Sequence, residues 1–402
     1  MVAKLDKIFN SFVENRIFKN KGVLQTSYTP DTIPHRDKQI EAVASILAPS
    51  LRGERVSNLF CFGKTGTGKT LSVQYVTNEI LKRIKESGGD NLRVVYVNCK
   101  LKKVADTEYR ILAEIISSLG ESVHSTGLPT GAVYSKFVEI IERKKQLILI
   151  VLDEIDQAVK KIGDNFLYTL TRLNSELKNS QISIVGISNS LTFMDNIDPR
   201  VRSSLGEEEL VFPPYNALQL QDILRERTED AFSEGVLQEG VIAKCAAFAA
   251  REHGDARRAL DLLRVAGEIA ERESLDKLNL DCIDKANNKI ERDKMIDIIE
   301  NEPKQHQLVL YSIMHLSKDK NYDKIFTGNV YNRYQELCQR TKNDILTQRR
   351  ISDIIAEFDM LGLINVDVIS RGRKGRTREI KMMLPETIKT KAEEILITSL
   401  ML

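Results

Sequence analysis

The side chains best suited to chemistry lie in one short glycine-rich stretch. It has the spacing G-x-x-x-x-G-K-[ST] of a phosphate-binding loop and reads Gly63-Lys64-Thr65-Gly66-Thr67-Gly68-Lys69-Thr70. Glycines let the backbone approach a phosphate closely, and a helix that begins after the loop directs its free N–H groups at the anion. We therefore expect these residues and the following Leu71 to bind ATP or ADP, with Lys69 on the β- and γ-phosphates and the Thr70 hydroxyl on Mg²⁺.

A second group of polar residues follows two predicted strands. Residues 147–152 are all apolar, which is typical of a parallel strand covered on both faces, and Asp153 and Glu154 come directly after them. Asp153 would hold Mg²⁺, directly or through water, and Glu154 would orient and deprotonate the attacking water. Asn189 follows the predicted strand 182–187, and its amide could position the same water.

The elements that must position these residues alternate between strands and helices. The first part of the chain has apolar runs at 56–62, 94–97, 147–152, 182–187 and 210–212, separated by helical patterns at 36–48, 107–119, 131–143 and 166–177. This alternation predicts an α/β fold with a parallel sheet and right-handed crossovers. Ligands of such sheets bind beyond the carboxyl ends of the strands, where all of the residues above fall.

The strand pattern then stops. Four helical patterns at 218–228, 241–252, 256–271 and 280–292 predict a small helical domain, and residues 300–303 predict a linker. Helical patterns at 307–316, 327–341 and 347–361, followed by alternating strands at 363–368 and 377–382, predict a winged-helix domain. The predicted domains are therefore 1–215, 216–300 and 305–395.

Composition limits the class of protein. A chain of 402 residues with 42% apolar and 29% charged residues is typical of two or three globular domains. No stretch approaches the roughly 18 apolar residues of a membrane span, and the N-terminus has no signal-peptide core, so we expect a cytoplasmic protein. Five dispersed cysteines without a C-x-x-C pair argue against a disulfide framework or a zinc site.

Positive charge gathers near the C-terminus. Residues 371–381 hold six cationic side chains and one acidic side chain, which is the pattern of a nucleic-acid-binding surface. A winged helix would present the start of its third helix to the major groove of DNA, with Gln348, Arg349 and Arg350 as candidates. The turn between the two strands would lie along phosphates or enter the minor groove through Arg371, Arg373, Lys374 and Arg376.

The order of the motifs GKTGTGKT, LILIVLDEID, ISIVGISN and GDARRALDLLR resembles that of the AAA+ ATPases. With the winged helix, nearly the whole chain resembles the archaeal replication initiators related to origin recognition complex subunits and cell-division-control helicase loaders. The resemblance implies that Asn189 is the sensor 1 residue and that Arg257 is the sensor 2 residue, which reaches the γ-phosphate from a helical lid. It also implies nucleotide contacts at the domain junction from Tyr215 and Arg227, and near the adenine from His35 and Arg36.

The same resemblance implies a function. It predicts an initiator that binds duplex origin DNA under the control of ATP and ADP, helps to load an MCM-type replicative helicase, and works beside paralogous initiator subunits on the nucleoid. An added helix in the ATPase domain would bring Lys102 and Lys103 to DNA. The usual Ser-Arg pair of the arginine finger is absent, which leaves Arg200 and Arg202 as substitutes and predicts weak, slow hydrolysis. The alternative is a DNA-binding regulator on the same scaffold; a small-molecule kinase would not explain the lid or the winged helix.

Overall fold

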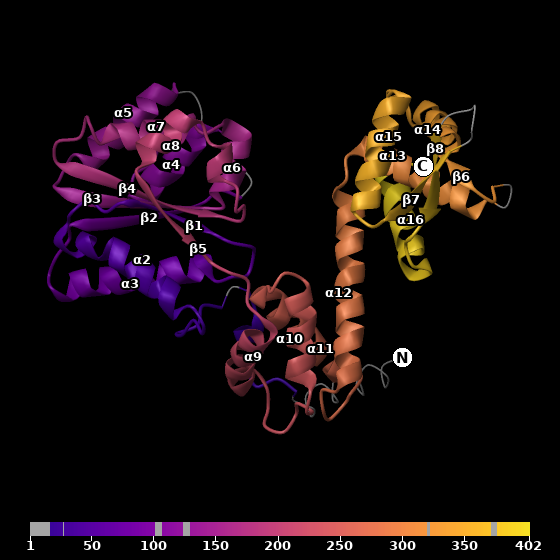
Figure 1. The fold of residues 1–402 in the computed structure, drawn as a ribbon, viewed down its shortest axis with the longest axis horizontal. Helices are drawn as coiled ribbons and strands as arrows, with labels where there is room; N and C mark the ends of the chain where they lie inside the picture. Colours follow the sequence, from indigo (N-terminus) through magenta and orange to yellow (C-terminus); the bar gives the residue numbers. More distant parts are fainter. Residues whose placement is uncertain (1–16, 27, 101–106, 124–128, 320–321, 371–375) are drawn as a thin grey trace. The chain divides into compact units, whose positions relative to one another are not determined.

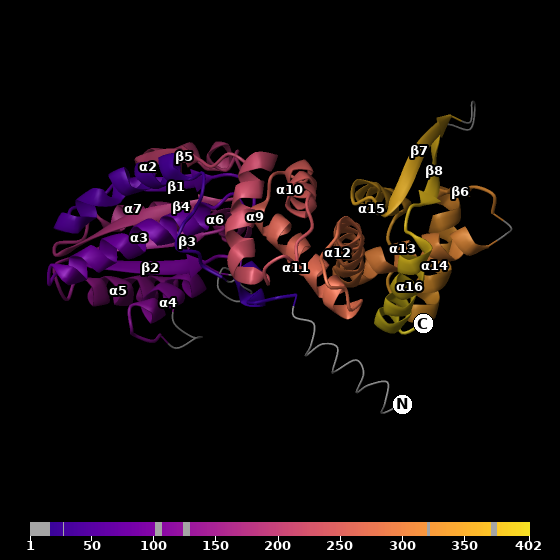
Figure 2. The same cartoon turned by 90° about the horizontal axis from the view of Figure 1, so that it is seen from below.

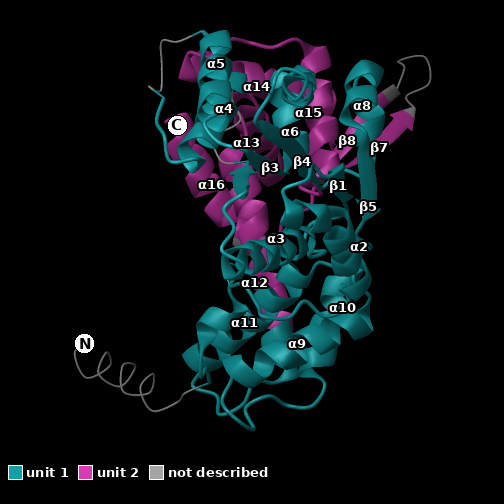
Figure 3. Ribbon diagram, turned by 90° about the vertical axis from the view of Figure 1, so that its left-hand side faces the viewer, with its two compact units in different colours: residues 1–283 teal, residues 284–402 magenta. Residues whose placement is uncertain are grey.

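The structure, a computed structural model, describes residues 17–26, 28–100, 107–123, 129–319, 322–370 and 376–402. The chain forms two compact units, Met1–Ile283 and Asp284–Leu402 (Figure 3). The boundary falls within one long helix, α12 (Leu280–Asn301). Within the described part of the chain, no helix is both long enough and apolar enough to cross a membrane.

A parallel sheet of five strands organises the first unit (Figure 1). Its order is β2-β3-β4-β1-β5, with bounds Leu92–Asn98, Gln146–Asp153, Ser180–Ser188, Asn58–Phe62 and Glu207–Val211. Every neighbouring pair is parallel, and the register places Phe62 beside Ser188 and Leu152 beside Gly186. The carboxyl ends of β3, β4 and β1 therefore lie next to one another at one edge, as predicted from the apolar runs.

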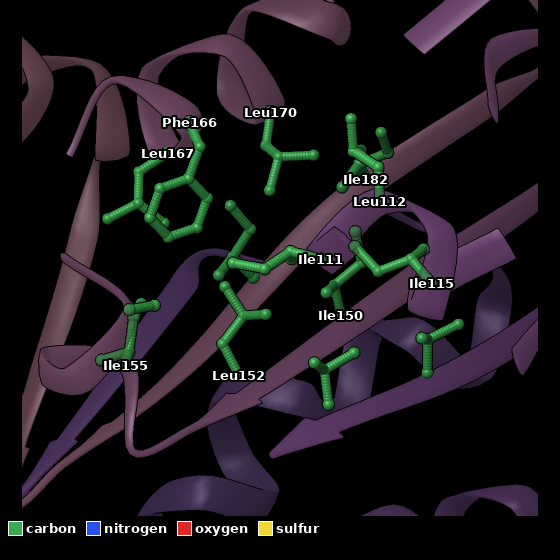
Figure 4. Packing of buried hydrophobic residues seen from close by; sticks show 14 of the residues in the cluster. Ile111, Leu112, Ile115, Ile150, Leu152, Ile155, Phe166, Leu167, Leu170 and Ile182 are labelled. Carbon is green, nitrogen blue, oxygen red and sulfur yellow. The ribbon is translucent and has the colours of Figure 1, made fainter. Parts of the chain in front are cut away.

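Helices cover both faces of this sheet. One face packs against α2 (Asp37–Leu47) and α3 (Lys69–Glu86), and the other packs against α4 (Glu108–Ser118), α5 (Thr130–Ile141), α6 (Ile155–Ile162), α7 (Asn165–Leu173) and α8 (Pro199–Leu205). The spacing of apolar residues explains the docking: Ile111, Leu112 and Ile115 recur on one side of α4 and meet Ile150 and Ile182 of the sheet (Figure 4).

A helical lid completes the first unit (Figure 2). It contains α9 (Ala217–Ala231), α10 (Val241–Arg251), α11 (Ala256–Arg272) and the start of α12. The described residues from 17 onward pack against it, because Phe18 stacks on Phe232 at 4.9 Å between ring centroids and Lys21 pairs with Glu268 at 2.7 Å. The N-terminal segment is thereby fastened to the lid.

The second unit has a winged-helix arrangement. Helices α13 (Lys304–Lys318), α14 (Thr327–Thr341) and α15 (Gln348–Met360) pack with a three-stranded antiparallel sheet of order β6-β8-β7, whose bounds are Ile325–Phe326, Arg376–Met382 and Ile364–Ser370. A further helix, α16 (Glu386–Leu400), buries Ala392 and Leu396 in the same core. The fold class predicted from the sequence is confirmed for both units.

Several elements differ from the prediction. The segment 300–303 is a junction between helices, since α12 continues to Asn301 and Pro303 is the N-cap of α13. Helices α6, α8 and α16 and strand β6 were not predicted. Two of them have a proline at their start, because Pro199 is the first residue of α8 and Pro385 is the N-cap of α16. Proline favours helix starts although it breaks helix interiors. All five cysteines are buried and free.

Candidate nucleotide-binding and DNA-binding sites

The phosphate-binding loop lies between β1 and α3, as its sequence predicts. Strand β1 ends at Phe62 and α3 begins at Lys69, so the free N–H groups of α3 face the loop. Gly63 must lack a side chain, because a Cβ there would lie 2.4 Å from the carbonyl oxygen of Phe212. Gly68, the N-cap of α3, has φ 84°, a left-handed conformation that glycine adopts without strain.

Lys69 is held at the centre of the loop. Its Nζ donates hydrogen bonds to the carbonyl oxygens of Gly63 and Lys64, both at 2.8 Å, and to Oδ1 of Asn189 at 3.0 Å. Only 5% of Lys69 is exposed. Burial lowers the pKa of its ammonium group to about 8, although the nearby Asp153 carboxylate opposes this shift.

Two oxygen donors suited to Mg²⁺ meet beside Lys69. Thr70 Oγ1 donates to Asp153 Oδ2 at 3.0 Å, and the carboxylate is 6% exposed. Hydroxyl and carboxylate oxygens are the ligands that Mg²⁺ prefers, so this pair fits the ion predicted from the sequence. The Tyr96 hydroxyl donates to the same Oδ2 atom, and burial together with Asp153 raises the pKa of Tyr96. Tyr96 was not predicted as a site residue.

Glu154 and Asn189 take separate positions at the strand ends. Glu154 adopts a left-handed conformation with φ 54°, which turns the chain from β3 into α6, and its Oε2 lies 3.6 Å from Lys100 Nζ. Asp156 holds the backbone at Asn189 in place. Its Oδ1 accepts hydrogen bonds from the Asn189 backbone N–H at 3.3 Å and from Ser188 Oγ at 3.2 Å. Asp156 is buried and was not predicted as part of the site.

A pocket of about 370 Å³ brings most of the predicted nucleotide residues together. It is bounded by the phosphate loop, the strand ends and the lid, and its lining includes Thr65, Gly66, Thr67, Gly68, Lys69, Thr70, Leu71, Asp153, Glu154, Asn189, Tyr215, Arg227 and Arg257. Its volume lies within the usual range for a small-molecule site. Gly63 and Lys64 shape the loop but do not line the pocket.

His35 and Arg36 lie outside this lining. Arg36 is 1% exposed and holds the loop in place: its Nε donates to the Thr67 carbonyl at 2.8 Å and its Nη2 donates to the Pro213 carbonyl at 2.6 Å. Its guanidinium stacks 3.8 Å from the centroid of the Tyr215 ring, and burial lowers its pKa. His35 Nε2 lies 3.1 Å from Asp222 Oδ2. Arg36 therefore acts on the loop that would hold a nucleotide.

The N-terminal segment forms one wall of the pocket, a role that its sequence did not indicate. Residues 23, 25, 26, 28–30 and 32–34 line the pocket together with lid residues. Arg227 lies 4.7 Å from the centroid of the Tyr28 ring, and the Thr32 hydroxyl donates to Glu226. Burial lowers the pKa of Arg227. The wall is thus fastened to α9.

The two candidate arginine fingers differ in their surroundings. Arg200, at the start of α8, has an 87% exposed side chain and pairs with Asp198 at 3.1 Å. Arg202 lies among three carboxylates, Asp195, Glu207 and Glu209, at 3.9, 3.5 and 3.2 Å. Neither arginine lines the pocket of its own chain. Arg200 is the more accessible of the two to another subunit.

The predicted DNA-binding residues lie in the second unit and in two segments outside the described residues. Gln348, Arg349 and Arg350 are exposed in the first turn of α15, while the helix buries Ile351, Ile354, Ile355 and Phe358. Arg350 Nη1 lies 3.5 Å from Glu357 Oε1. Lys102, Lys103, Arg371, Arg373 and Lys374 lie outside the described residues, and of Arg376 only the backbone, paired with Ser370, is described.

One pocket is lined by a phosphate-binding loop, by acids at the end of β3, by an asparagine at the end of β4 and by an arginine of the lid. This arrangement defines an AAA+ ATPase module, here followed by a winged helix. Comparison with known families agrees: residues 53–194 match the AAA domain, residues 221–288 the Cdc6 AAA+ ATPase-type lid domain, and residues 297–392 the CDC6 C-terminal winged helix domain.

Similar proteins identify the family. The chain is 54% identical to the ORC1-type DNA replication protein of Pyrococcus furiosus over 385 residues, which cover 94% of this chain and 90% of that protein. It is 50% identical to ORC1-type DNA replication protein 1 of Methanosarcina acetivorans, covering 95% and 91% of the two chains. It also resembles the solved structure of the Aeropyrum pernix ORC1 protein in complex with DNA, with 44% identity, coverage of 95% and 97%, and a TM-score of 0.82. The chain belongs to the ORC1-type DNA replication proteins, and the family predicted from its motifs is confirmed.

Proposed function

We propose that this protein is an ATP-controlled DNA replication initiator that binds duplex DNA at origins. The observation that carries the proposal is that Lys69 of the phosphate loop and Arg257 of the lid line one pocket. A lid that contacts the γ-phosphate through Arg257 has different interactions with ATP and ADP, and only such a difference can shift a conformational equilibrium. The bound nucleotide would therefore control the state of the lid.

Hydrolysis would be carried out by the residues at the strand ends. Thr70 and Asp153 would hold Mg²⁺, which neutralises charge on the β- and γ-phosphates. Glu154 would orient the attacking water and accept its proton, and Asn189, whose backbone N–H is held by Asp156, would position the same water through its amide. We expect slow turnover by an isolated chain, because Arg200 would have to reach the pocket of a neighbouring subunit.

DNA would be bound by the winged helix. The first turn of α15 presents Gln348, Arg349 and Arg350 to solvent, which is where a helix-turn-helix contacts base edges. The Aeropyrum pernix ORC1 protein, solved in complex with DNA, is similar to 95% of this chain. Phosphate contacts would be added by Arg371, Arg373 and Lys374, which come between β7 and β8 in the sequence, by Arg376 at the start of β8, and by Lys102 and Lys103.

We further propose the partners of this activity. An initiator of this class would recruit an MCM-type replicative helicase to the origin and assemble beside paralogous subunits on the nucleoid of the cytoplasm. The name of the relatives, ORC1-type DNA replication protein, supports a role in replication rather than in transcription.

Two measurements test the proposal. Lys69→Ala should abolish ATP binding in a fluorescence titration, whereas the matched change Lys85→Ala, at the exposed far end of the same helix, should leave it intact. Mapping of bound DNA across the genome should find the protein at replication start sites. Enrichment at promoters alone would instead support the DNA-binding regulator, and ATP binding by Lys69→Ala would contradict the nucleotide site.

A further inference from the structure

The carboxylate of Asp255 lies where the lid meets the phosphate loop. The turn before it contains two residues with positive φ, His253 at 76° and Gly254 at 66°. This turn presents Asp255 as the N-cap of α11, where its Oδ1 accepts hydrogen bonds from the backbone N–H groups of Arg257 at 2.8 Å and Arg258 at 3.3 Å. Asp255 thereby determines where the first turn of α11, including Arg257, begins.

The other side of the same carboxylate contacts the phosphate loop. Thr65 Oγ1 donates to Asp255 Oδ2 at 3.2 Å, and the backbone N–H of Ala256 donates to the Gly66 carbonyl at 3.2 Å. The contact is so close that a Cβ on Gly66 would lie 1.7 Å from Asp255 Oδ1. The loop position therefore requires glycine because of the lid as well as because of its φ of 67°.

This contact restricts the conformation of the loop. The C=O and N–H groups of a trans peptide point in opposite directions, so fixing the Gly66 carbonyl on the lid turns the Thr67 N–H away from the lid. The Thr67 carbonyl is in turn held by Arg36 Nε at 2.8 Å. The peptides at the centre of the loop are thus fixed from two sides, and one of those sides is the lid.

We propose that Asp255 is a positioning residue that latches the lid to the phosphate loop and so slows the release of bound nucleotide. This inference rests on the proposed nucleotide binding. One carboxylate joins three parts of the site: Oδ2 holds the loop through Thr65, Oδ1 holds the first turn of α11, and that turn carries Arg257 into the pocket. Nucleotide leaves faster when the latch is broken, because loop and lid then separate more easily.

Substitutions separate the hydrogen bonds from the charge. Asparagine caps helices as well as aspartate does and can still bond to Thr65, so Asp255→Asn keeps the latch while removing the negative charge. Asp255→Ala removes both the cap and the latch. Thr65→Val removes the loop side of the contact while leaving Asp255 and the cap of α11 in place, and Thr65→Ser restores the hydroxyl. Thr107→Ala removes the N-cap of α4, outside the pocket, and is the control for loss of a cap.

The experiment measures the dissociation rate of a fluorescent ADP analogue from the full-length protein by stopped flow. Asp255→Ala should release it about tenfold faster, since the loss of one hydrogen bond at the upper end of the usual range corresponds to roughly one factor of ten. Thr65→Val should release it about threefold faster, and the double variant no faster than Asp255→Ala, because both changes break one contact. Asp255→Asn and Thr107→Ala should stay within about twofold of the wild type, and Thr65→Ser should release the analogue more slowly than Thr65→Val.

Three results would overturn the latch: unchanged release by Asp255→Ala, multiplying effects in the double variant, or an asparagine variant as fast as the alanine variant. The last result would assign the effect to charge. A folding defect is recognised separately, because Thr65→Val leaves the cap and the lid untouched. If the wild type binds no ADP analogue at all, the proposed nucleotide function fails instead, so the two failures can be told apart.

Discussion

The pKa of Lys69 predicts that ATP binding weakens at alkaline pH. In the protein this pKa is about 8, below the ordinary 10.5, chiefly because the ammonium is buried. Triphosphate stabilises the charged form, so ATP must bind together with a proton whenever Lys69 is neutral. If the pKa of Lys69 in the ATP complex is 10.5 or higher, the dissociation constant of ATP should rise about 30-fold between pH 7 and 9.5. The slope should approach tenfold per pH unit.

The assay is a fluorescence titration with ATP at half-unit steps of pH, constant ionic strength and saturating Mg²⁺. Calorimetry in two buffers of different ionisation enthalpy adds a direct count of protons. Nucleotide binding should take up about 0.9 proton at pH 9 and about 0.1 at pH 7. Lys69→Arg is the matched control, because a guanidinium remains charged across this range and should make the pH dependence disappear.

The expected loss of ATP binding at high pH is not explained by unfolding through the titration of Lys69, because deprotonation of Lys69 stabilises the folded protein. A lysine whose pKa is lowered in the folded state binds fewer protons there than in the unfolded chain between pH 8 and 10.5, so its contribution to stability increases with pH in that window. The increase amounts to roughly 3 kcal/mol. Equal affinity at pH 7 and 9.5, or no proton uptake at pH 9, would refute the reasoning.

Three other substitutions test other parts of the site. Tyr96→Phe removes the hydroxyl that donates a hydrogen bond to Asp153. The Mg²⁺ concentration that gives half-maximal hydrolysis should rise about tenfold, because a residue that orients a metal ligand is lost. An unchanged Mg²⁺ titration would contradict this. Arg36→Met leaves buried backbone carbonyls without their donor and should lower the free energy of unfolding by about 3 kcal/mol or more, measured by chemical denaturation. Little change would mean that water replaces the guanidinium. Arg200→Ala should leave ATP binding unchanged but slow hydrolysis at least tenfold in preparations assembled on DNA; equal rates with and without the arginine would remove it as a finger.

Local sequence patterns were sufficient to predict most of the fold. The all-apolar run 147–152 became β3, buried from Leu147 to Asp153, and the periodic residues of 107–119 became the buried side of α4. The short helices α6 and α8 were missed because seven or eight residues give too few turns for a periodic pattern. Helix α16 was missed because Pro385 stands at its start, where a proline is easily taken for a break.

The site was predictable to the extent that its residues belong to contiguous motifs. Lys69, Thr70 and Asp153 were found in this way, and the structure brings them together. Tyr96 and Asp156 were missed because their roles depend on long-range pairing: Tyr96 lies beside Val151 only through the register of β2 with β3, and Asp156 meets Asn189 across two strand ends.

Residues at the lid were harder still to predict. The sequence shows Asp255 only as part of the motif that contains Arg257, because its contact with Thr65 joins residues 190 positions apart. The segment of residues 23–34 gave no motif, and its role as a pocket wall follows from its packing against the lid. Such docking of distant segments depends on complementary surfaces, which no local pattern records.

The strand order has a consequence for how the protein is made on the ribosome. Strand β1, which carries the phosphate loop, pairs with β4 and β5 and not with β2, which follows it in the chain. Its partners lie more than 100 residues downstream, so β1 leaves the ribosome long before it can join a sheet. Arg257 emerges later still. Contacts between the lid and a nucleotide therefore form only after the lid has been synthesised, and the apolar residues Leu59, Phe60 and Phe62 have no neighbouring strand until β4 and β5 have emerged.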